Sequence, residues 1–347
     1  MAAPSPEDLE KMLLGAIPRY RWTADDVVKG LDLKDKTILV TGATSGIGIP
    51  TAIALARTGC KLVITARDET KGTATLEAIN KECGAADVTV KALDMCSYAS
   101  VQSFVKEWGD QKIDVLLHNA GVMAIPFTKT KDGEEQQMQV NFHAVVMLTE
   151  LLLPCFTETA RICVVSSSAH RQGSTLKPSF MEAFEKYMAE DLEAEGYDKW
   201  NAYMVAKSAV IMYCNQLNLE LTQKGSKIRV NSLHPGAIRT GLQASLSQEE
   251  MAAMGWLDKD GNVSPVFKTV EQGAATSVWL SVSPEMDGIG GTYSENCTVT
   301  AKEDFGTGDL LSRVKGTAPH VWPEKDCAQV AEVVRTHLKK KGLLSML

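Results

Sequence analysis

The sequence lacks a long apolar run and an excess of positive charge, and its first residues are not expected to act as a signal peptide. No segment approaches the roughly 18 consecutive apolar residues of a membrane-spanning helix, so no transmembrane segment is predicted. The net charge of -7 supplies no basic face to neutralise phosphates, which argues against a nucleic-acid partner. The first residues, MAAPSPEDLEKMLL, carry acids where a signal peptide has a basic region, so we expect a cytoplasmic protein.

Paired cysteine motifs are also missing. The eight cysteines are scattered, and no two of them form a Cys-x-x-Cys pair. They are Cys60, Cys83, Cys96, Cys155, Cys163, Cys214, Cys297 and Cys327. This pattern is typical of reduced thiols in a reducing compartment rather than of a disulfide framework. The six histidines show no ligand spacing with the cysteines, so no metal site is predicted.

What the chain does contain is a regular alternation of short apolar runs and longer helical patterns. With 347 residues, 44% hydrophobic and 23% charged, its composition is typical of a soluble globular protein. Strands are predicted at residues 36–40, 61–65 and 88–93, a strand with its turn at 113–121, and further strands at 161–170 and 227–236. Helical patterns between them indicate βαβ units, and hence one doubly wound α/β domain with a mostly parallel sheet covered on both faces.

The predicted domain has an extension at each end. We expect an N-terminal extension over residues 1–33, a Rossmann-type catalytic domain over 34–300 and a C-terminal extension over 301–347 packed on the same domain. A substrate lid is expected near residues 240–268. No linker is long enough to separate two domains.

A glycine-rich turn, TGATSGIG, follows the first predicted strand and opens the first helix. Gly42 can form the tight turn, Gly46 can let the backbone approach a pyrophosphate, and Gly48 can let helix and strand pack closely. The helix N-terminus adds unpaired N–H groups for an anion. An ordinary glycine-rich turn is the alternative, but the position between strand and helix favours a dinucleotide site.

The end of the second strand indicates which dinucleotide is used. The sequence there reads ITARD, so Arg67 stands where an NAD-binding protein has an acid for the ribose hydroxyls. Arg67 can offer a forked cation to a 2′-phosphate. Asp68 is better placed to cap the following helix. The sequence therefore predicts NADP(H) in preference to NAD(H).

A tyrosine and a lysine lie four residues apart in the helical stretch NAYMVAKSAV. At this spacing Tyr203 and Lys207 share one helix face. An ammonium beside a phenol favours the phenolate, so we expect Lys207 to lower the pKa of Tyr203. The pair could also arise by chance, and the other motifs must decide.

Six motifs occur in one order: TGATSGIG, HNAG, Asn141 in MQVNFHAV, VVSSSAH, YMVAK and HPGAIRT. In combination they resemble the classical short-chain dehydrogenase/reductase family, in its retinol-dehydrogenase-like and fungal oxidoreductase branch. The resemblance covers roughly residues 34–295 and implies a seven-stranded Rossmann-type sheet. It also implies a catalytic tetrad of asparagine, serine, tyrosine and lysine.

The resemblance assigns each tetrad role to a residue of this chain. Tyr203 would donate the proton when a carbonyl is reduced, and Lys207 would tune Tyr203 and hold the nicotinamide ribose. Ser167 would hydrogen-bond the substrate oxygen. Asn141 would hold a helix and a water that links Lys207 to solvent. Ser166 and Ser168 stand beside Ser167 in the sequence, and the family register favours Ser167.

The resemblance also implies a set of cofactor contacts. They are Gly42, Thr44, Ser45, Gly46, Ile47, Gly48, Arg67, Asp94, Met95, Asn119, Ala120, Gly121, Tyr203, Lys207, Pro235, Gly236, Ile238 and Thr240. Helix capping is the alternative role for Asp94 and for Thr240. His118, where the family has a different residue, is interpreted as structural.

Two stretches are longer than a minimal family member needs, at residues 171–200 and 241–267. Both could shape a substrate pocket. Met251, Met254 and Trp256 in the second stretch would form an apolar wall, although a helix packed on the body explains them equally well. The KKKG run of the C-terminal extension is interpreted as a solvated helix end.

These observations predict an NADP(H)-dependent oxidoreductase that reduces the carbonyl of a lipophilic small molecule, or oxidises the alcohol, in secondary metabolism. One alternative is a dehydration or isomerisation at the same site; another is a non-catalytic NADP(H)-binding regulator. Family habit implies a homo-oligomer formed through the helix of Tyr203 and Lys207 and its neighbour.

Overall fold

The computed structural model describes residues 6–177, 179–258, 260–300, 302 and 316–345. Within these residues, eight strands form one sheet in the order β3-β2-β1-β4-β5-β6-β7-β8. The strands are β1 (Thr37–Thr41), β2 (Lys61–Ala66), β3 (Val88–Ala92), β4 (Ile113–His118), β5 (Phe156–Val165), β6 (Arg229–His234), β7 (Tyr293–Glu295) and β8 (Thr298–Val299). All neighbours pair in parallel except β7 and β8.

The sheet confirms the predicted doubly wound, mostly parallel architecture, but the predicted count of seven strands is wrong by one. The eighth, β8, is a short antiparallel edge strand. It returns along β7 through a turn at Asn296 and Cys297, whose φ angles are 55° and 53°. The sequence contained no signal for this strand, because Thr298–Val299 is too short to show a periodicity.

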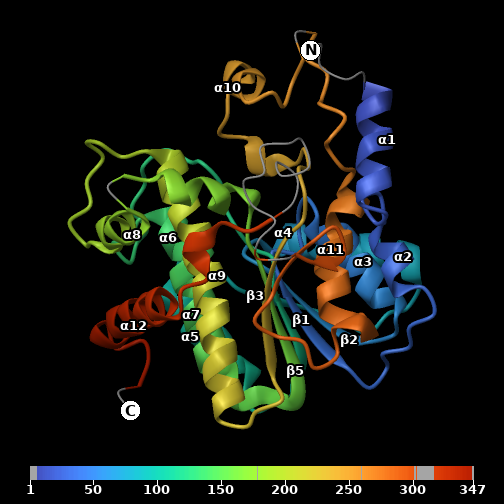
Figure 1. The fold of residues 1–347 in the computed structure, drawn as a ribbon. Coiled ribbons are helices and arrows are strands. Elements are labelled where there is room, and N and C mark those ends of the chain that lie inside the picture. The colour runs from blue at the N-terminus through green and yellow to red at the C-terminus, as the bar shows by residue number, and fades with distance from the viewer. Residues whose placement is uncertain (1–5, 178, 259, 301, 303–315, 346–347) are drawn as a thin grey trace.

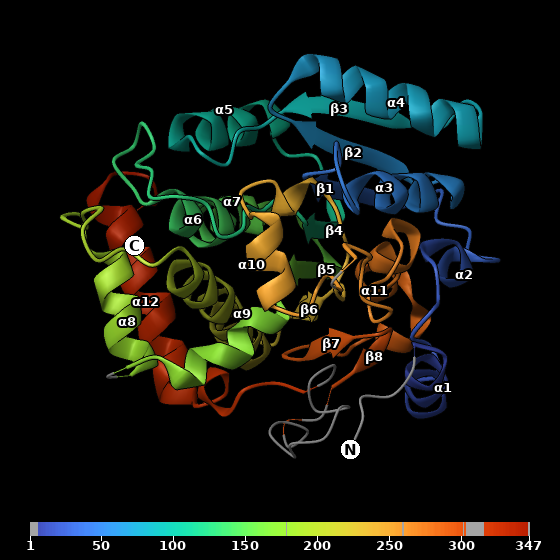
Figure 2. The same cartoon turned by 90° about the horizontal axis from the view of Figure 1, so that it is seen from above.

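Helices lie on both faces of the sheet (Figures 1 and 2). They are α1 (Pro6–Ala16), α2 (Ala24–Val28), α3 (Gly48–Arg57), α4 (Glu69–Cys83), α5 (Tyr98–Trp108), α6 (Gln136–Met138), α7 (Ala144–Leu152), α8 (Phe180–Met188), α9 (Lys199–Gln223), α10 (Gln248–Ala253), α11 (Val270–Val282) and α12 (Glu324–Lys340). A π-helical segment, η1 (Gln139–His143), joins α6 to α7.

Two separate hydrophobic cores result, one on each face. Helices α2, α3, α4 and α11 cover one face, and α5, α7, α8, α9 and α12 cover the other. Strand β1 contributes to both, since Ile38 and Val40 lie in the first core and Leu39 in the second, all with no exposed surface. This burial on both sides explains why β1 reads as an unbroken apolar run.

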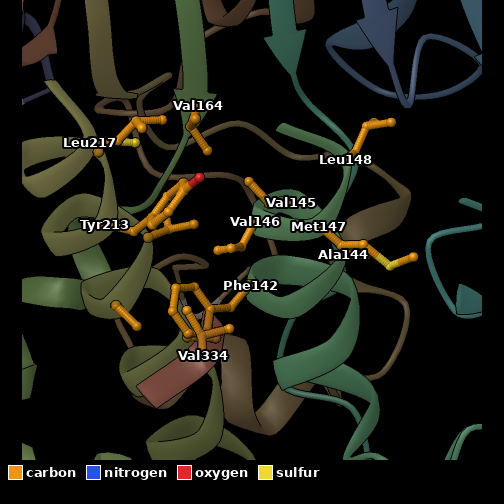
Figure 3. Packing of buried hydrophobic residues seen from close by; sticks show 14 of the residues in the cluster. Phe142, Ala144, Val145, Val146, Met147, Leu148, Val164, Tyr213, Leu217 and Val334 are labelled. Carbon is orange, nitrogen blue, oxygen red and sulfur yellow. The ribbon is translucent and has the colours of Figure 1, made fainter. Parts of the chain in front are cut away.

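The C-terminal helix α12 packs against α9 and α7 on the second face (Figure 1). Val334 of α12 lies with Phe142 of η1 and Tyr213 of α9 in the same buried cluster (Figure 3). The guanidinium of Arg335 also pairs with Glu150 at 2.7 Å and Glu220 at 2.8 Å. This part of the predicted C-terminal extension is therefore an integral layer of the fold; residues 301 and 303–315 lie outside the described residues.

The N-terminal extension contacts the segments on either side of α11 and the turn between β7 and β8. Leu13, Ile17 and Tyr20 form a small buried cluster against Val266, and Arg19 pairs with Glu285 at 2.7 Å. Helix α1 (Pro6–Ala16) lies in this extension.

One stretch, Gln136–Cys155, is long and apolar enough by composition to span a bilayer. It consists of α6, η1, α7 and the turn that follows, and 78% of its most apolar window is buried inside the protein. Packing in the core accounts for its apolar character.

Candidate active site

The glycine-rich turn connects β1 to α3 and is closely approached by its neighbours. A Cβ atom at Gly42, whose φ is 66°, would lie 2.6 Å from the Ala120 backbone. A Cβ atom at Gly48 would lie 2.2 Å from the Gly42 carbonyl oxygen. Only glycine fits at these two positions, because real Cβ contacts do not become this short. The turn is therefore built so that backbone, rather than side chains, lines the N-terminus of α3.

The predicted contacts from the HNAG motif lie beside this turn. The Asn119 side chain donates to the Gly42 carbonyl oxygen at 2.8 Å. The backbone N–H groups of Asn119 and Ala120 both donate to the Thr41 hydroxyl, at 3.1 and 3.2 Å. Thr44 and Ile47 are half-buried in the turn, whereas Ser45 is exposed. These bonds fix the end of β4 against the end of β1, where the strand order reverses and ligands bind in such sheets.

The segment after β6 reaches the same turn from the other side. A Cβ atom at Gly46 would lie 3.3 Å from the Thr240 side chain, and Ile238 and Ile47 both approach Gly273. Thr240 also caps the short helix η4 (Gly241–Gln243), as the alternative interpretation expected. Pro235 is buried, and Gly236 follows with a φ of 109° against the Lys268 side chain.

Arg67 and Asp68 have separate roles after β2. Asp68 is the N-cap of α4 and accepts from the Lys71 backbone N–H at 3.0 Å, as expected. Arg67 is exposed and makes no hydrogen bond or ion pair with any other described residue. Its guanidinium is therefore available for a ligand at the edge of the cofactor region.

Asp94 lies after β3, and its carboxylate accepts from the Cys96 N–H at 2.9 Å. Capping of α5 falls to Ser97, not to Asp94. Met95 is buried in the core. A cavity of about 420 Å³ opens beside Asp94, between Ser97, Lys129 and Gln136. A larger cavity, of about 520 Å³, lies between the N-terminal extension and β7–β8 and contains none of the predicted site residues.

Asn141 and Lys207 converge on Gly121. The Asn141 amide pairs with both backbone groups of Val122, at 3.0 Å to its N–H and 2.9 Å to its carbonyl. A Cβ atom at Gly121 would lie 3.0 Å from Asn141 Oδ1 and 3.4 Å from Lys207 Nζ. The Lys207 ammonium donates to the Val165 carbonyl at 2.9 Å. Asn141 itself lies in η1, a π-helical segment of the kind often found at functional sites.

The three consecutive serines make different contacts. Ser166 is buried and donates to the Lys207 carbonyl at 2.7 Å. Ser167 caps the 3-10 helix η3 (Ser168–Thr175), and its side chain acts to lower the pKa of Tyr203. The Ser168 N–H donates to His234 at 3.2 Å. Of the three serines, Ser167 is therefore the one whose side chain affects the pKa of Tyr203.

The expected lowering of the Tyr203 pKa is not what the structure gives. Burial raises the pKa of Tyr203 to about 12, and the Ser167 side chain only partly opposes this rise. The Lys207 Nζ atom lies 5.9 Å from the centre of the Tyr203 ring. Burial also lowers the pKa of Lys207 to about 8. Desolvation dominates the pKa of both groups, and Tyr203 is a protonated phenol at neutral pH.

An apolar cluster surrounds Tyr203. Its buried members are Met123, Ala124, Tyr203, Leu246, Met251 and Leu257, with Ala169, Trp200 and Trp256 partly buried against them. The Trp200 ring packs edge-on against two rings: its centre lies 6.3 Å from that of Tyr203 and 6.2 Å from that of Trp256. Met251 and Trp256 belong to this cluster, whereas Met254 is exposed, and the apolar substrate wall stays a prediction.

The segment that carries α10 is held over this cluster by polar contacts. The Ser245 hydroxyl lies 3.1 Å from the carbonyl oxygens of both Met123 and Ala124. The Lys199 ammonium pairs with Glu250 at 2.6 Å. Ala124 has a φ of 46°, an uncommon conformation for a residue with a side chain.

Sequence reasoning missed several of these residues. Trp200 lies three positions before Tyr203, so the i, i+3 rule could have placed it on the same helix face. Met123 and Ala124 follow the HNAG motif directly but had no pattern of their own. Leu246 and Leu257 reach the cluster only through tertiary packing.

His118 is buried, and its Nε2 atom lies 2.9 Å from the Thr149 hydroxyl. Burial lowers the pKa of His118 to about 3, so it is neutral. This environment agrees with its interpretation as a structural histidine.

One cluster of metal-ligand residue types was not visible in the sequence. Atoms of Glu134, His143 and His337 lie within 4.8 Å of one another. The Lys341 ammonium, from the KKKG run, is 3.0 Å from Glu134, so that run is not simply solvated. Burial would raise the pKa of Glu134, but His337, His143 and Lys341 together lower it to about 2. The carboxylate already has cationic and hydrogen-bonding partners, and the expected absence of a metal site stays a prediction.

Comparisons with known proteins agree with this arrangement. A model of the family described as short chain dehydrogenase matches residues 36–181 and 191–251. Mouse retinol dehydrogenase 14 is 34% identical over 282 residues, covering 76% of this chain and 78% of the mouse protein. Human polyprenol dehydrogenase is 32% identical over 278 residues, covering 76% of this chain and 77% of the human protein. A solved short-chain dehydrogenase of Shigella flexneri complexed with NADP is 26% identical, with a TM-score of 0.55, covering 77% of this chain and 98% of that one.

Proposed function

The chain belongs to the short-chain dehydrogenase/reductase family of oxidoreductases, and on that premise we propose that it is an NADP(H)-dependent reductase of lipophilic carbonyl compounds, or a dehydrogenase of the corresponding alcohols. The observation that carries the proposal is the position of Tyr203. Tyr203 lies in an apolar cluster on a helix turn shared with Lys207, and the Ser167 side chain acts on its pKa. A proton donor, a hydroxyl partner and an apolar wall thus meet at one point.

The residues present fit a dinucleotide. The turn at Gly42 and Gly48 has no room for a side chain, so its backbone can be approached closely by a pyrophosphate. Asn119 and Thr240 flank that turn, and Asp94 and Met95 lie further along the strand ends. Bound there, the nicotinamide supplies or accepts the hydride. Lys207 and Gly121 are the residues that would lie near its ribose.

Arg67 supports NADP(H) over NAD(H). It is an exposed guanidinium without a partner among the described residues, and Asp68 is committed to the cap of α4. A bidentate guanidinium suits a 2′-phosphate, whereas a carboxylate would suit the ribose hydroxyls of NAD. The Shigella relative was solved with NADP, which is consistent with this preference.

The protonation states favour carbonyl reduction at neutral pH. Because burial raises its pKa to about 12, Tyr203 holds its proton and can donate it to a developing alkoxide. Ser167 would hydrogen-bond the same oxygen and stabilise its charge. Lys207, whose pKa burial lowers to about 8, is still mostly cationic at pH 7 and adds positive potential. Alcohol oxidation needs the phenolate and should therefore become faster as the pH rises.

The walls around Tyr203 support an apolar substrate. Met123, Met251 and Leu246 are buried there, and Trp200 and Trp256 present aromatic surface. Two relatives are named for retinol and polyprenol, both lipophilic alcohols. A role in secondary metabolism remains part of the proposal.

Location and assembly are also proposals. All eight cysteines are free thiols, which supports a reducing, cytoplasmic environment. A homo-oligomer through α7 and α9 would need the face that α12 covers in this chain, with Arg335 bonded to Glu150 and Glu220. Any such assembly would therefore use another surface.

The test follows NADPH absorbance with a panel of aldehydes, simple ketones, quinones and polycyclic ketones. Wild type should turn over an apolar carbonyl, and Tyr203→Phe should lose about 10²–10⁴-fold in kcat while it still binds NADPH. Tyr213→Phe is a matched control, because Tyr213 lies on the same helix and bonds to Glu150, away from the cluster.

Turnover that survives in Tyr203→Phe would overturn the assignment of Tyr203. NADPH binding without turnover of any substrate would favour a regulator. A product whose mass differs from that of simple reduction would favour dehydration or isomerisation instead.

A further inference from the structure

His170 has two hydrogen bonds that the proposed mechanism does not use. It is fully buried, three residues after Ser167. Its Nδ1 atom lies 2.6 Å from the Ser167 carbonyl oxygen, and its Nε2 atom accepts the Ala318 N–H at 3.2 Å. Because Nε2 accepts a hydrogen bond, the ring proton is on Nδ1, which donates to Ser167. Burial lowers the pKa of His170 to about 3, so this neutral form persists at physiological pH.

The bond to Ser167 fixes the residue that contacts Tyr203. Strand β5 ends at Val165, so Ser167 lies beyond the ladder of the sheet. Its side-chain oxygen accepts from the Ala169 N–H at 3.1 Å, and its carbonyl accepts from the His170 ring. The orientation of the Ser167 hydroxyl therefore depends on the turn that His170 closes.

The other bond of His170 leads to a segment almost 150 residues later in the chain. Arg171 donates to the Gly316 carbonyl at 2.8 Å, and Glu295 accepts the Gly316 N–H at 2.7 Å. Arg171 and Glu295 also pair with each other at 2.7 Å and are buried. This ion pair anchors the chain at Gly316, two residues before the Ala318 that bonds to His170.

The same segment also contacts the helix of Tyr203 and Lys207. His320 lies 3.0 Å from the hydroxyl of Ser208, which directly follows Lys207. The Val321 carbonyl accepts from Asn215 of α9 at 2.9 Å. A Cβ atom at Gly173 would lie 2.9 Å from both His320 and Ser208, so η3, the segment and α9 are in close contact here.

We propose that His170 is a positioning residue for Ser167, and that residues 316–321 act on the active site through it. The segment lies beyond the residues matched by the family model. The segment bonds to His170, which in turn bonds to Ser167, and it contacts Ser208, the residue after Lys207. It therefore connects the end of β5 to helix α9, and these two elements carry the reacting groups. The kinetic part of this inference rests on the proposed function.

Two substitutions at His170 test the idea. His170→Phe keeps an aromatic ring against Tyr293, whose centre is 4.9 Å away, but loses both hydrogen bonds. We expect kcat for carbonyl reduction to fall about 10–100-fold, because small misplacements of catalytic groups have effects of this order. The Kd for NADPH should stay within about twofold, since the hydrogen-bond partners of His170 are not predicted cofactor contacts. His170→Gln, whose amide can both donate and accept, should recover most of the loss.

His337→Phe is the matched control. It makes the same exchange within the C-terminal extension that His170 contacts, but His337 bonds to Glu134 at 2.8 Å and not to the Ser167 turn. We expect a comparable decrease in Tm but a kcat within about threefold of wild type. Equal losses of kcat in the two variants would mean that His170 only stabilises the extension, and would overturn the proposal.

The pH profile of alcohol oxidation gives a second reading. Since the Ser167 contact lowers the Tyr203 pKa, His170→Phe should move the profile to higher pH. His337→Phe should leave it in place. An unshifted profile together with wild-type kcat in His170→Phe would contradict a positioning role.

Amide hydrogen exchange tests the positioning role of His170 even if no substrate turns over. Failure of this inference can therefore be distinguished from failure of the proposed function. His170→Phe should speed exchange in peptides that cover residues 166–169 and residues 316–322 together. His337→Phe should affect only α12. Release of residues 316–322 with unchanged exchange at residues 166–169 would show that the segment does not act on Ser167.

Discussion

The candidate site has two halves, a glycine-rich turn formed by backbone and a region around Tyr203 formed by side chains. The glycine-rich turn offers backbone, and Gly42 and Gly48 leave no space for a side chain. The region around Tyr203 is built from side chains, with Met123, Trp200 and Met251 brought together from three separate segments. The first half depends on a short stretch between β1 and α3, whereas the second depends on packing across the whole chain.

This difference teaches where each kind of specificity resides. Backbone N–H groups at a helix start recognise a phosphate whatever the side chains are. The apolar wall recognises whichever substrate fits its shape and depends on every residue that lines it. Substitutions in the turn should therefore affect binding of the cofactor, and substitutions in the wall should affect the substrate alone.

The largest effect on cofactor binding is expected at Gly48, where the turn is tightest. Gly48→Ala should weaken NADPH binding by up to about 100-fold, because overpacking costs roughly 1–3 kcal/mol and each 1.4 kcal/mol is tenfold in affinity. The added Cβ atom would lie 2.2 Å from the Gly42 carbonyl oxygen. Titration of NADPH fluorescence measures the effect. Gly15→Ala, at a glycine with no atom within 4 Å of the new Cβ, should bind normally.

The next largest effect concerns the choice of cofactor. Arg67→Gln should weaken NADPH binding by about tenfold or more and leave NADH unchanged, since hydrogen bonds to charged groups contribute about 1.5–3 kcal/mol. Paired titrations of both cofactors measure the ratio. Asp68→Ala should instead cost about 1 kcal/mol of stability through the lost cap and leave the ratio alone. An unchanged ratio in Arg67→Gln would remove the argument for NADP(H).

A wall substitution should separate the two halves. Trp200→Ala should raise KM for an apolar ketone by about tenfold, as expected for loss of part of a large aromatic contact surface. The Kd for NADPH and the turnover of a small polar aldehyde should change little. Steady-state kinetics with both substrates measures this. A parallel rise of both KM values would mean that Trp200 supports the fold rather than the wall.

The smallest effect is expected at the ion pair between Lys199 and Glu250. Both side chains are partly exposed, at 26% and 37%, so Lys199→Met should change KM by less than about threefold. Because salt screens such pairs, the difference from wild type should disappear in high salt. A salt-independent change would point to a packing role for the Lys199 side chain.

The sequence alone predicted what depends on neighbours in the chain. The turn after β1, the cap at Asp68 and the shared helix face of Tyr203 and Lys207 all follow from spacing within a few residues. The doubly wound sheet followed from the alternation of strands and helices. The resemblance to a family added the serine and the asparagine, whose spacing alone carried little information.

What depends on burial could not be predicted in this way. The Tyr203 pKa was expected to fall because Lys207 is close in sequence, yet burial among Met123, Met251 and Trp200 raises it. The partners of His170 and Lys341 lie in distant segments, so no local pattern indicated them. Strand β8 was missed because two residues are too few to show a period.

The strand order has a consequence for synthesis and folding of the chain. From β1 the sheet grows outward in chain order, through β2 and β3 on one side and then β4 to β8 on the other. No strand has to insert between two that have already paired, so each can add to an existing edge as it leaves the ribosome. The nucleotide half can therefore assemble early, whereas His170, which bonds to Ser167, gains its second partner Ala318 only when the last part of the chain has been made.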